Sequence, residues 1–183
     1  GQNIPYKIKE FIIQAGIQAP SGENTQSWKF SISDNTIILK IDPASDFSFF
    51  NIQRRASILS SGCVLENIKI AASIFGLSCD IQLNKGNIEE TQEIAHIHLI
   101  NNHIERDALF RSIWERCTNR KQYSKEKIAP FVFDEIKKIA KEFEGIELNI
   151  IDDRKDLKAL RSALVKIGIV RTENPEVHKF LHH

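Results

Sequence analysis

Methionine is absent from this chain of 183 residues, cysteine occurs three times, and neither sign of charge dominates, since the formal net charge is +1. Three widely spaced cysteines without a C-x-x-C pair do not make the disulfide framework of a small secreted protein, so we expect a reducing, cytoplasmic compartment. A net charge near zero gives no broad field that would attract nucleic acid or an acidic membrane surface. No apolar run is long enough to cross a bilayer. Because no initiator methionine is present, we expect the chain to be part of a longer one.

Two nucleotide-binding motifs are missing as well. Neither G-x-G-x-x-G nor G-x-x-x-x-G-K-[ST] occurs, which argues against a doubly wound dinucleotide fold and against a P-loop. The sequence also offers no convincing Ser-His-Asp or Cys-His set for nucleophilic catalysis. Hydrophobic residues make up 42% of the chain, which is enough for a core. We therefore expect an α+β layered domain with an antiparallel or mixed sheet flanked by long helices.

The periodicity of apolar residues places the elements of this domain. Spacings of three and four predict helices, and strict alternation predicts half-buried strands. The predicted helices are residues 7–19, 53–75, 106–115, 130–143 and a last helix capped by Asp153, and the predicted strands are residues 28–33, 37–41, 79–83, 94–100 and 146–151. The inward face predicted for the long second helix is Ile58, Gly62, Leu65, Ile68, Ala72 and Phe75, and the apolar face of the last helix is Leu157, Leu160, Leu164 and Ile167.

Aromatic and histidine side chains raise further possibilities. Three phenylalanines at positions 47, 49 and 50 either plug the core or cover a ligand, and we favour the core because such side chains bury large areas. His96 and His98 share one face of a predicted strand, and His178 and His182 are spaced as i and i+4. A metal site needs more ligands than such a pair, so we expect no metal here.

A loop between the first helix and the first strand draws attention. Residues 19–28 read Ala-Pro-Ser-Gly-Glu-Asn-Thr-Gln-Ser-Trp, with small or amide side chains between an amphipathic helix and a strand. Such a loop brings backbone and neutral hydrogen-bonding groups close to a ligand, or it is an ordinary surface turn. Glu23 within it is either a proton donor or a solvated carboxylate.

A basic segment at residues 116–123 is the second candidate. Arg116 and Arg120 bracket Thr118 and Asn119, with Lys121 alongside. Two guanidinium groups with a hydroxyl and an amide suit a phosphate, which arginine binds through two hydrogen bonds. The alternative is a solvated basic turn that pairs with Glu115 or Glu126.

Both stretches resemble motifs of one family. Residues 20–28 resemble the APSxxNxQPW signature of the nitroreductase family, whose members are FMN-dependent α+β oxidoreductases, with Ser27 where the family usually has proline. Residues 116–123 resemble the basic R-x-[ST]-x-R-x-[FY] segment with which ordinary members begin, although here it follows the loop. That order resembles the double-length, Acg-like branch, in which two halves are fused. The resemblance therefore implies a first half at residues 1–105 and the start of a second half at residues 106–183.

The resemblance also implies a cofactor, a reaction and site residues. Hydride would pass from NAD(P)H through flavin N5 to a nitro, quinone or similar small-molecule acceptor, so that no catalytic side chain is needed. Family members usually complete the FMN site where two halves or two subunits meet, which implies a homodimer or a fused second half. A protein that binds or sequesters flavin without turnover is the alternative, and a scaffold without flavin is a third possibility. Arg116 and Arg120, supported by Thr118, would contact the FMN phosphate and the polar edge of the flavin, and the residues lining the flavin pocket would be Ser21, Gly22, Asn24 and Gln26.

Overall fold

The computed structural model describes residues 3–42, 44–45, 51–86, 92–124, 126–175 and 177. The chain forms two compact units, Gly1–Thr118 and Asn119–His183. The division into two nitroreductase-like halves at residues 105 and 106 stays a prediction. Phe47, Phe49, Phe50, His178 and His182 lie outside the described residues.

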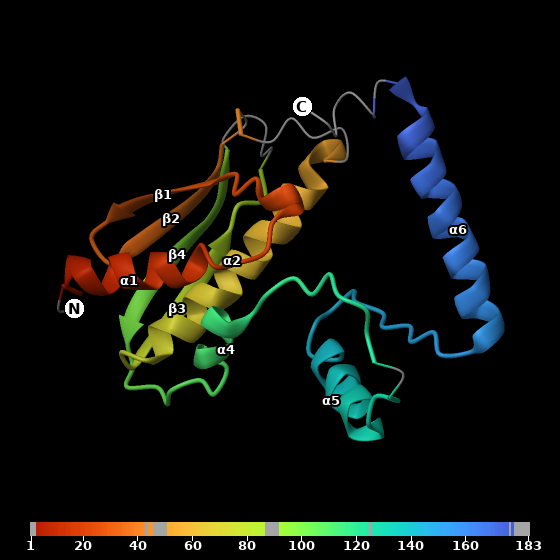
Figure 1. Ribbon diagram of the computed structural model, residues 1–183. Coiled ribbons are helices and arrows are strands. Elements are labelled where there is room, and N and C mark those ends of the chain that lie inside the picture. Colours follow the sequence, from red (N-terminus) through yellow and green to blue (C-terminus); the bar gives the residue numbers. More distant parts are fainter. Residues whose placement is uncertain are drawn as a thin grey trace. The chain divides into compact units, whose positions relative to one another are not determined.

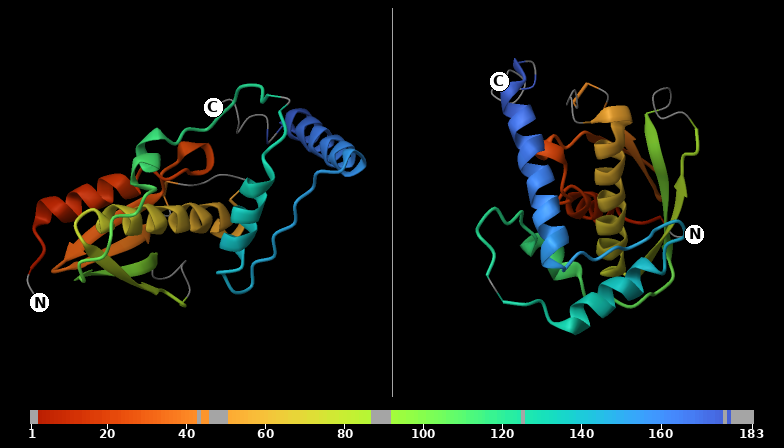
Figure 2. Two further views of the ribbon diagram at one scale, coloured as in Figure 1. Left: turned by 90° about the horizontal axis from the view of Figure 1, so that it is seen from below. Right: turned by 90° about the vertical axis from the view of Figure 1, so that its right-hand side faces the viewer.

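The first unit is an antiparallel sheet with helices on one face. Its described strands form a four-stranded sheet in the order β1-β2-β4-β3, and helices α1 and α2 lie together on the same side of it (Figures 1 and 2). The elements are α1 (Tyr6–Gly16), β1 (Trp28–Ser33), β2 (Thr36–Ile41), α2 (Arg55–Ser73), β3 (Leu77–Leu83), β4 (Glu93–Asn101) and α4 (Phe110–Glu115), with 3-10 turns η1 (Gly22–Asn24) and η2 (Ile52–Arg54). The predicted α+β class is confirmed.

Alternation along the strands builds the core. In β2 the side chains of Ile37, Leu39 and Ile41 are buried against the helices, and in β4 Ala95 and Ile97 are fully buried. Apolar burial of this kind is the main favourable contribution to folding. The strands predicted at residues 28–33 and 37–41 are confirmed and form a hairpin, with Trp28 paired to Ile41 and Ser33 to Thr36.

Helices α1 and α2 approach each other closely at Gly16. A Cβ atom on Gly16 would lie 3.0 Å from Cγ1 of Ile68, which is fully buried in α2. Ile12 and Ala15 of α1 are fully buried as well. The helix predicted at residues 7–19 is therefore present with an apolar inward face, although α1 ends at Gly16, before the predicted end.

The inward face of α2 differs from the prediction at its first two turns. Ile58 is 40% exposed and Gly62 is also exposed, whereas Ser60 and Ser61 are buried. The hydroxyls of Ser60 and Ser61 donate to the carbonyl oxygens of Ala56 and Ser57, each at 2.8 Å. Because these bonds satisfy the hydroxyls within the helix, serine can face the core where isoleucine was expected. Farther along, Leu65, Ile68 and Ala72 are buried as predicted, whereas Phe75, just past the helix, is 37% exposed.

Helix α4 begins at Phe110, later than the predicted start at residue 106. Asp107 forms a turn ahead of it, because its carboxylate accepts the N–H of Leu109 at 2.7 Å while its own N–H donates to Ser73 Oγ at 2.9 Å. Such side-chain bonds compete with helical hydrogen bonds. Among its apolar residues Ile113 is buried and Phe110 packs half-buried against the core, whereas Leu109 and Trp114 are exposed.

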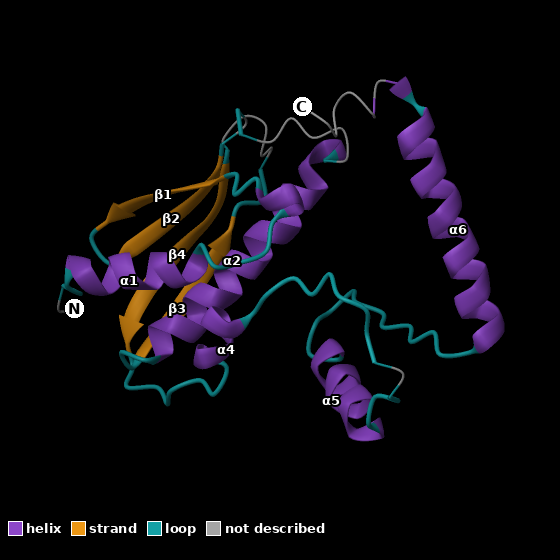
Figure 3. Ribbon diagram, viewed as in Figure 1, coloured by secondary structure: helices purple, strands orange, loops and turns teal. Residues whose placement is uncertain are grey.

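The second unit contains two helices, α5 (Pro130–Ala140) and α6 (Arg154–Glu173), among its described residues. Pro130 opens α5, and the Asp153 carboxylate caps α6 by accepting the N–H of Lys155 at 2.8 Å, both as predicted. The strand predicted at residues 146–151 is wrong, since this exposed segment is irregular (Figure 3). Alternation alone does not make a strand, which also needs a neighbour to complete its hydrogen bonds. None of the helices in the described part of the chain is both long enough and apolar enough to span a membrane.

Candidate functional site

The 21–27 loop is closed by hydrogen bonds of its own. The N–H of Gln26 donates to Ser21 Oγ at 3.1 Å, and the N–H of Asn24 donates to the Ser21 carbonyl at 3.1 Å. Glu23, Asn24 and Gln26 all have positive φ, between 48° and 58°. Left-handed conformations at three residues so close together are unusual outside glycine and turn the backbone sharply. The Glu23 side chain is exposed, which is the environment of a solvated carboxylate.

The structure places the four predicted loop residues beside the first turn of α2. Ser21 is half-buried, whereas Gly22, Asn24 and Gln26 are exposed. A Cβ atom on Gly22 would lie 3.9 Å from Cβ of Ala56. The loop therefore rests on the start of α2 and leaves the amide side chains of Asn24 and Gln26 accessible to a ligand.

The buried end of this loop is Ser27, which is 2% exposed. Its carbonyl accepts the N–H of Asp42 at 2.6 Å, and its hydroxyl donates to Ser57 Oγ at 3.3 Å. The next residue, Trp28, is 8% exposed and begins β1. An accessible loop is thus attached directly to the core.

Arg116 brings the basic segment to the loop. Its Nη2 donates to the carbonyl of Gln18 at 3.1 Å, although the two residues are 98 apart in sequence. Gln18 lies between the end of α1 and Ser21, so this contact joins the two stretches that the sequence singled out. Glu115, a partner expected in the alternative interpretation, pairs with Arg111 at 3.8 Å.

The other residues of the basic segment are accessible. Thr118 is exposed and is the last residue of the first unit. Arg120 is exposed too, and it belongs to the second unit. The contribution of Thr118 and Arg120 to a phosphate site stays a prediction.

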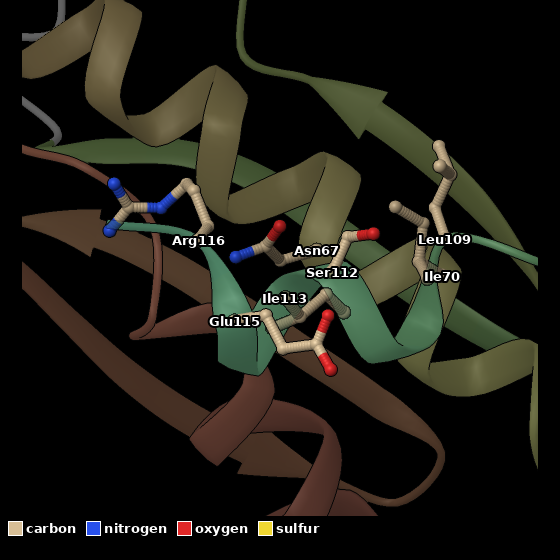
Figure 4. Close-up of a pocket in the computed structure, with 7 residues that line it drawn as sticks. All are labelled: Asn67, Ile70, Leu109, Ser112, Ile113, Glu115 and Arg116. Carbon is tan, nitrogen blue, oxygen red and sulfur yellow. The ribbon is translucent and has the colours of Figure 1, made fainter. Parts of the chain in front are cut away.

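A cavity of about 450 Å³ lies next to Arg116, between α2 and α4 (Figure 4). Its apolar wall includes Ile70 and Ile113, which are both buried. Polar atoms are contributed by Asn67, whose Nδ2 donates to the Ala15 carbonyl at 3.2 Å, and by Arg116. The complete lining is Asn67, Ile70, Leu109, Ser112, Ile113, Glu115 and Arg116. An apolar wall with a few polar groups is the usual construction of a small-molecule site.

The paired histidines lie away from this site, on the sheet. His96 Nε2 is 3.0 Å from Glu93 Oε2, and His98 Nδ1 is hydrogen-bonded to Thr36 Oγ1 at 2.8 Å. Hydrogen bonds from His96, and then from Lys40, hold the pKa of the Glu93 carboxyl below its usual value. Within the described ranges, no three potential metal ligands come together.

Three buried polar residues near the loop and hairpin escaped the sequence analysis. Lys9 is buried and its Nζ donates to the Asp34 carbonyl at the hairpin turn. Asn51 and Ser57 are buried as well and are hydrogen-bonded to each other. In the sequence these polar residues look like ordinary solvent-exposed positions, and only the tertiary structure shows that they are buried.

Comparison with known proteins gives limited similarity. No protein-family model matches the chain. It is 22% identical over 175 residues to the uncharacterized protein MT1398 of Mycobacterium tuberculosis (strain CDC 1551 / Oshkosh). The matched region is 96% of this chain and 24% of that protein. The chain thus spans about a quarter of the length of this curated relative.

Several solved structures that the chain matches are described as nitroreductases, each at low identity. The nitroreductase family protein from Streptococcus pneumoniae is 18% identical, covering 81% of this chain and 92% of that one, with a TM-score of 0.42. The FMN-dependent nitroreductase from Clostridium difficile is 11% identical, covering 82% and 91%, with a TM-score of 0.44. Nitroreductase CinD from Lactococcus lactis, in complex with 4-nitrophenol, is 15% identical, covering 70% and 92%, with a TM-score of 0.44.

Proposed function

We propose that this chain forms an FMN-binding part of an NAD(P)H-dependent oxidoreductase of the nitroreductase kind. The observation that carries the proposal is the contact between Arg116 Nη2 and the Gln18 carbonyl. It brings the first guanidinium of a phosphate-binding pattern to the entrance of a loop with accessible amides. A nucleotide with a phosphate at one end and a heteroaromatic ring at the other needs this combination.

The donors of Arg116 fit a phosphate. A guanidinium carries five N–H donors in a rigid fork, and the Gln18 carbonyl accepts from Nη2. The remaining donors can bind a phosphate oxygen while the contact to Gln18 fixes the orientation of the side chain. Thr118, two residues farther along, is exposed and can add a hydroxyl. Arg120 would add a second guanidinium, as the family pattern implies.

The loop residues fit the polar edge of a flavin. Carboxamides donate and accept hydrogen bonds, and those of Asn24 and Gln26 are accessible on a backbone whose conformation is fixed by Ser21. Gly22 lets a ring approach the backbone without hindrance from a side chain. In this proposal Ser21, Gly22, Asn24 and Gln26 orient the ring, and Arg116 holds the phosphate.

Bound FMN would supply hydride chemistry between NAD(P)H and a nitro, quinone or similar acceptor. The protein would contribute binding, orientation and a partly apolar environment. No side chain of this chain is required as a nucleophile, and we assign none.

We further propose that a homodimer or a fused second half completes the site, as in the Acg-like arrangement. Support comes from α6 in the second unit, where Leu157, Leu164 and Ile167 are 44%, 58% and 56% exposed. Apolar side chains gathered on one exposed helix are typical of a surface that a partner covers. The curated relative is also about four times as long as the matched region.

The test is titration of the purified chain with FMN, followed by its fluorescence and by flavin absorption after desalting. Arg116→Ala should raise the dissociation constant for FMN by about 10- to 100-fold, which is the factor expected when a charge-assisted hydrogen bond is lost. Arg111→Ala is the matched control, because Arg111 lies in the neighbouring helix α4 and its partner is Glu115. Equal affinities of both variants and the wild type would refute the phosphate assignment.

NADH oxidation with a quinone or nitro acceptor then separates the two flavin hypotheses. Steady oxidation supports an enzyme, whereas bound FMN without oxidation supports a flavin-sequestering protein. A wild-type chain that retains no flavin at saturating FMN would rule out both for this chain.

A further inference from the structure

A chain of buried polar side chains connects the 21–27 loop to the start of α2. Ser27 Oγ donates to Ser57 Oγ at 3.3 Å, and Asn51 Nδ2 donates to the same oxygen at 2.8 Å. All three side chains lie in the interior, with 2% exposure for Ser27, 2% for Ser57 and 9% for Asn51. Buried hydroxyl and amide groups are costly unless they are hydrogen-bonded, so this arrangement strongly favours one relative placement of the three segments.

Asn51 also caps helix α2 from outside its first turn. Its Oδ1 accepts the N–H of Ala56 at 3.0 Å and that of Ser57 at 3.3 Å. The residues in between include Gln53 and Arg54, which have φ values of 53° and 56°. This turn brings an asparagine five residues upstream into a position that an N-cap residue normally occupies. The same carboxamide therefore fixes the helix start and binds the hydroxyl that holds the loop.

The loop rests on the helix turn that Asn51 caps. Gly22 lies over Ala56, because a Cβ atom added to Gly22 would lie 3.9 Å from Cβ of Ala56, which is ordinary van der Waals contact. Ser27, at the other end of the loop, is held through Ser57, the neighbour of Ala56. The end of the loop is thus hydrogen-bonded to the turn of α2 that its beginning lies beside.

We propose that Ser27 and Ser57 are positioning residues that, with Asn51, set the 21–27 loop on α2 and thereby determine how tightly its amides bind a ligand. The part that concerns FMN rests on the proposed function above. Neither serine is expected to touch the ligand, because both are buried. In this proposal the hydrogen bond from Ser27 Oγ to Ser57 Oγ restrains the end of the loop.

The experiment compares four variants of the full chain: Ser57→Ala, Ser27→Ala, Ser57→Thr and Ser60→Ala. Ser57→Thr keeps an Oγ atom at the same position. Ser60→Ala is the matched control, since Ser60 is also buried in the same helix and its hydroxyl donates to the Ala56 carbonyl at 2.8 Å. Ser27→Ala leaves the bond between Asn51 and Ser57 in place and serves if Ser57→Ala fails to fold.

Amide hydrogen exchange of residues 24–26 is the readout that needs no flavin. Ser57→Ala and Ser27→Ala should accelerate exchange of these amides by about fivefold, the factor for the net worth of one hydrogen bond. Ser60→Ala should leave it unchanged, and Ser57→Thr, which keeps the hydroxyl but adds a methyl group in a buried site, should exchange more slowly than Ser57→Ala. The affinity for FMN should fall by a similar factor in the first two variants and not in Ser60→Ala.

Equal acceleration in Ser60→Ala, or no acceleration in either Ser57→Ala or Ser27→Ala, would overturn the proposal. A wild-type chain that binds no FMN would overturn the proposed function instead. The exchange measurement would still decide whether the serines position the loop, so the two failures are distinguishable.

Discussion

The close approach of α1 to α2 at Gly16 gives a quantitative prediction. In Gly16→Ala the new Cβ atom would lie 3.0 Å from Ile68 Cγ1, 3.3 Å from Ile68 Cδ1 and 3.4 Å from Val64 Cγ1. Overpacking of this kind costs about 1–3 kcal/mol. Alanine gains about 0.4–1 kcal/mol over glycine by restricting the unfolded chain. We therefore expect Gly16→Ala to lower the free energy of unfolding by about 1 kcal/mol.

The partner substitution should relieve that strain. Ile68 is fully buried, so Ile68→Ala alone should cost about 3–4 kcal/mol through lost burial and the cavity it leaves. Both crowded atoms of Ile68 are absent in this variant. The alanine methyl at position 16 can then enter the vacated space, and the double variant should lose about 1–2 kcal/mol less than the sum of the two single losses.

Urea denaturation followed by tryptophan fluorescence measures these free energies, because Trp28 is buried in the core of the first unit. Gly62→Ala is the control, since a Cβ atom there would have no described neighbour within 4 Å. It should stabilise α2 by about 0.5–1 kcal/mol. If Gly16→Ala stabilised the protein to the same extent, or if the costs of Gly16→Ala and Ile68→Ala were additive, the inferred close packing would be wrong.

Two further predictions concern ionisation. Hydrogen bonds from His96 and then Lys40 hold the pKa of Glu93 below its ordinary value of 4.5. Its contribution to stability is therefore present above that value and is lost as the pH falls through the folded-state pKa. Urea midpoints between about pH 3 and 7 should depend less on pH in Glu93→Gln than in the wild type, and an unchanged dependence would contradict this assignment. Burial raises the pKa of the Cys79 thiol to about 11, whereas Cys117 is exposed. Iodoacetamide at about pH 8 should therefore label Cys117 well before Cys79, as peptide mass spectrometry would show, and labelling at equal rates would refute the burial argument.

Much of the first unit could be predicted because its elements have strong periodicity. The hairpin from Trp28 to Ile41 alternates cleanly, and its register follows from the turn at Asp34. The face of α2 could not be predicted at Ser60 and Ser61, because the sequence does not show that their hydroxyls are satisfied inside the helix. At residues 146–151 alternation was present, but a strand requires a hydrogen-bonding neighbour as well.

For the candidate site, the sequence located the loop and the basic segment but not what holds them. The bond from Arg116 to Gln18 joins residues that no local pattern relates. Asn51 caps α2 by accepting the N–H groups of residues five and six positions ahead in the sequence. An ordinary N-cap side chain bonds only two or three residues ahead, so the sequence does not point to this one. Contacts of this kind depend on the path of the whole chain and become visible only in three dimensions.

The position of β4 in the sheet has a consequence for synthesis on the ribosome. This strand lies between β2 and β3 and pairs with both, yet it is completed about 60 residues after β2. At typical translation rates, the edge of β2 that pairs with β4 therefore lacks its partner strand for roughly 3–12 s. During that interval Ile37, Leu39 and Ile41 lie on a strand that another nascent chain could extend. Substitutions that delay β4 should thus reduce the yield of folded protein even where the stability of the finished fold is unchanged.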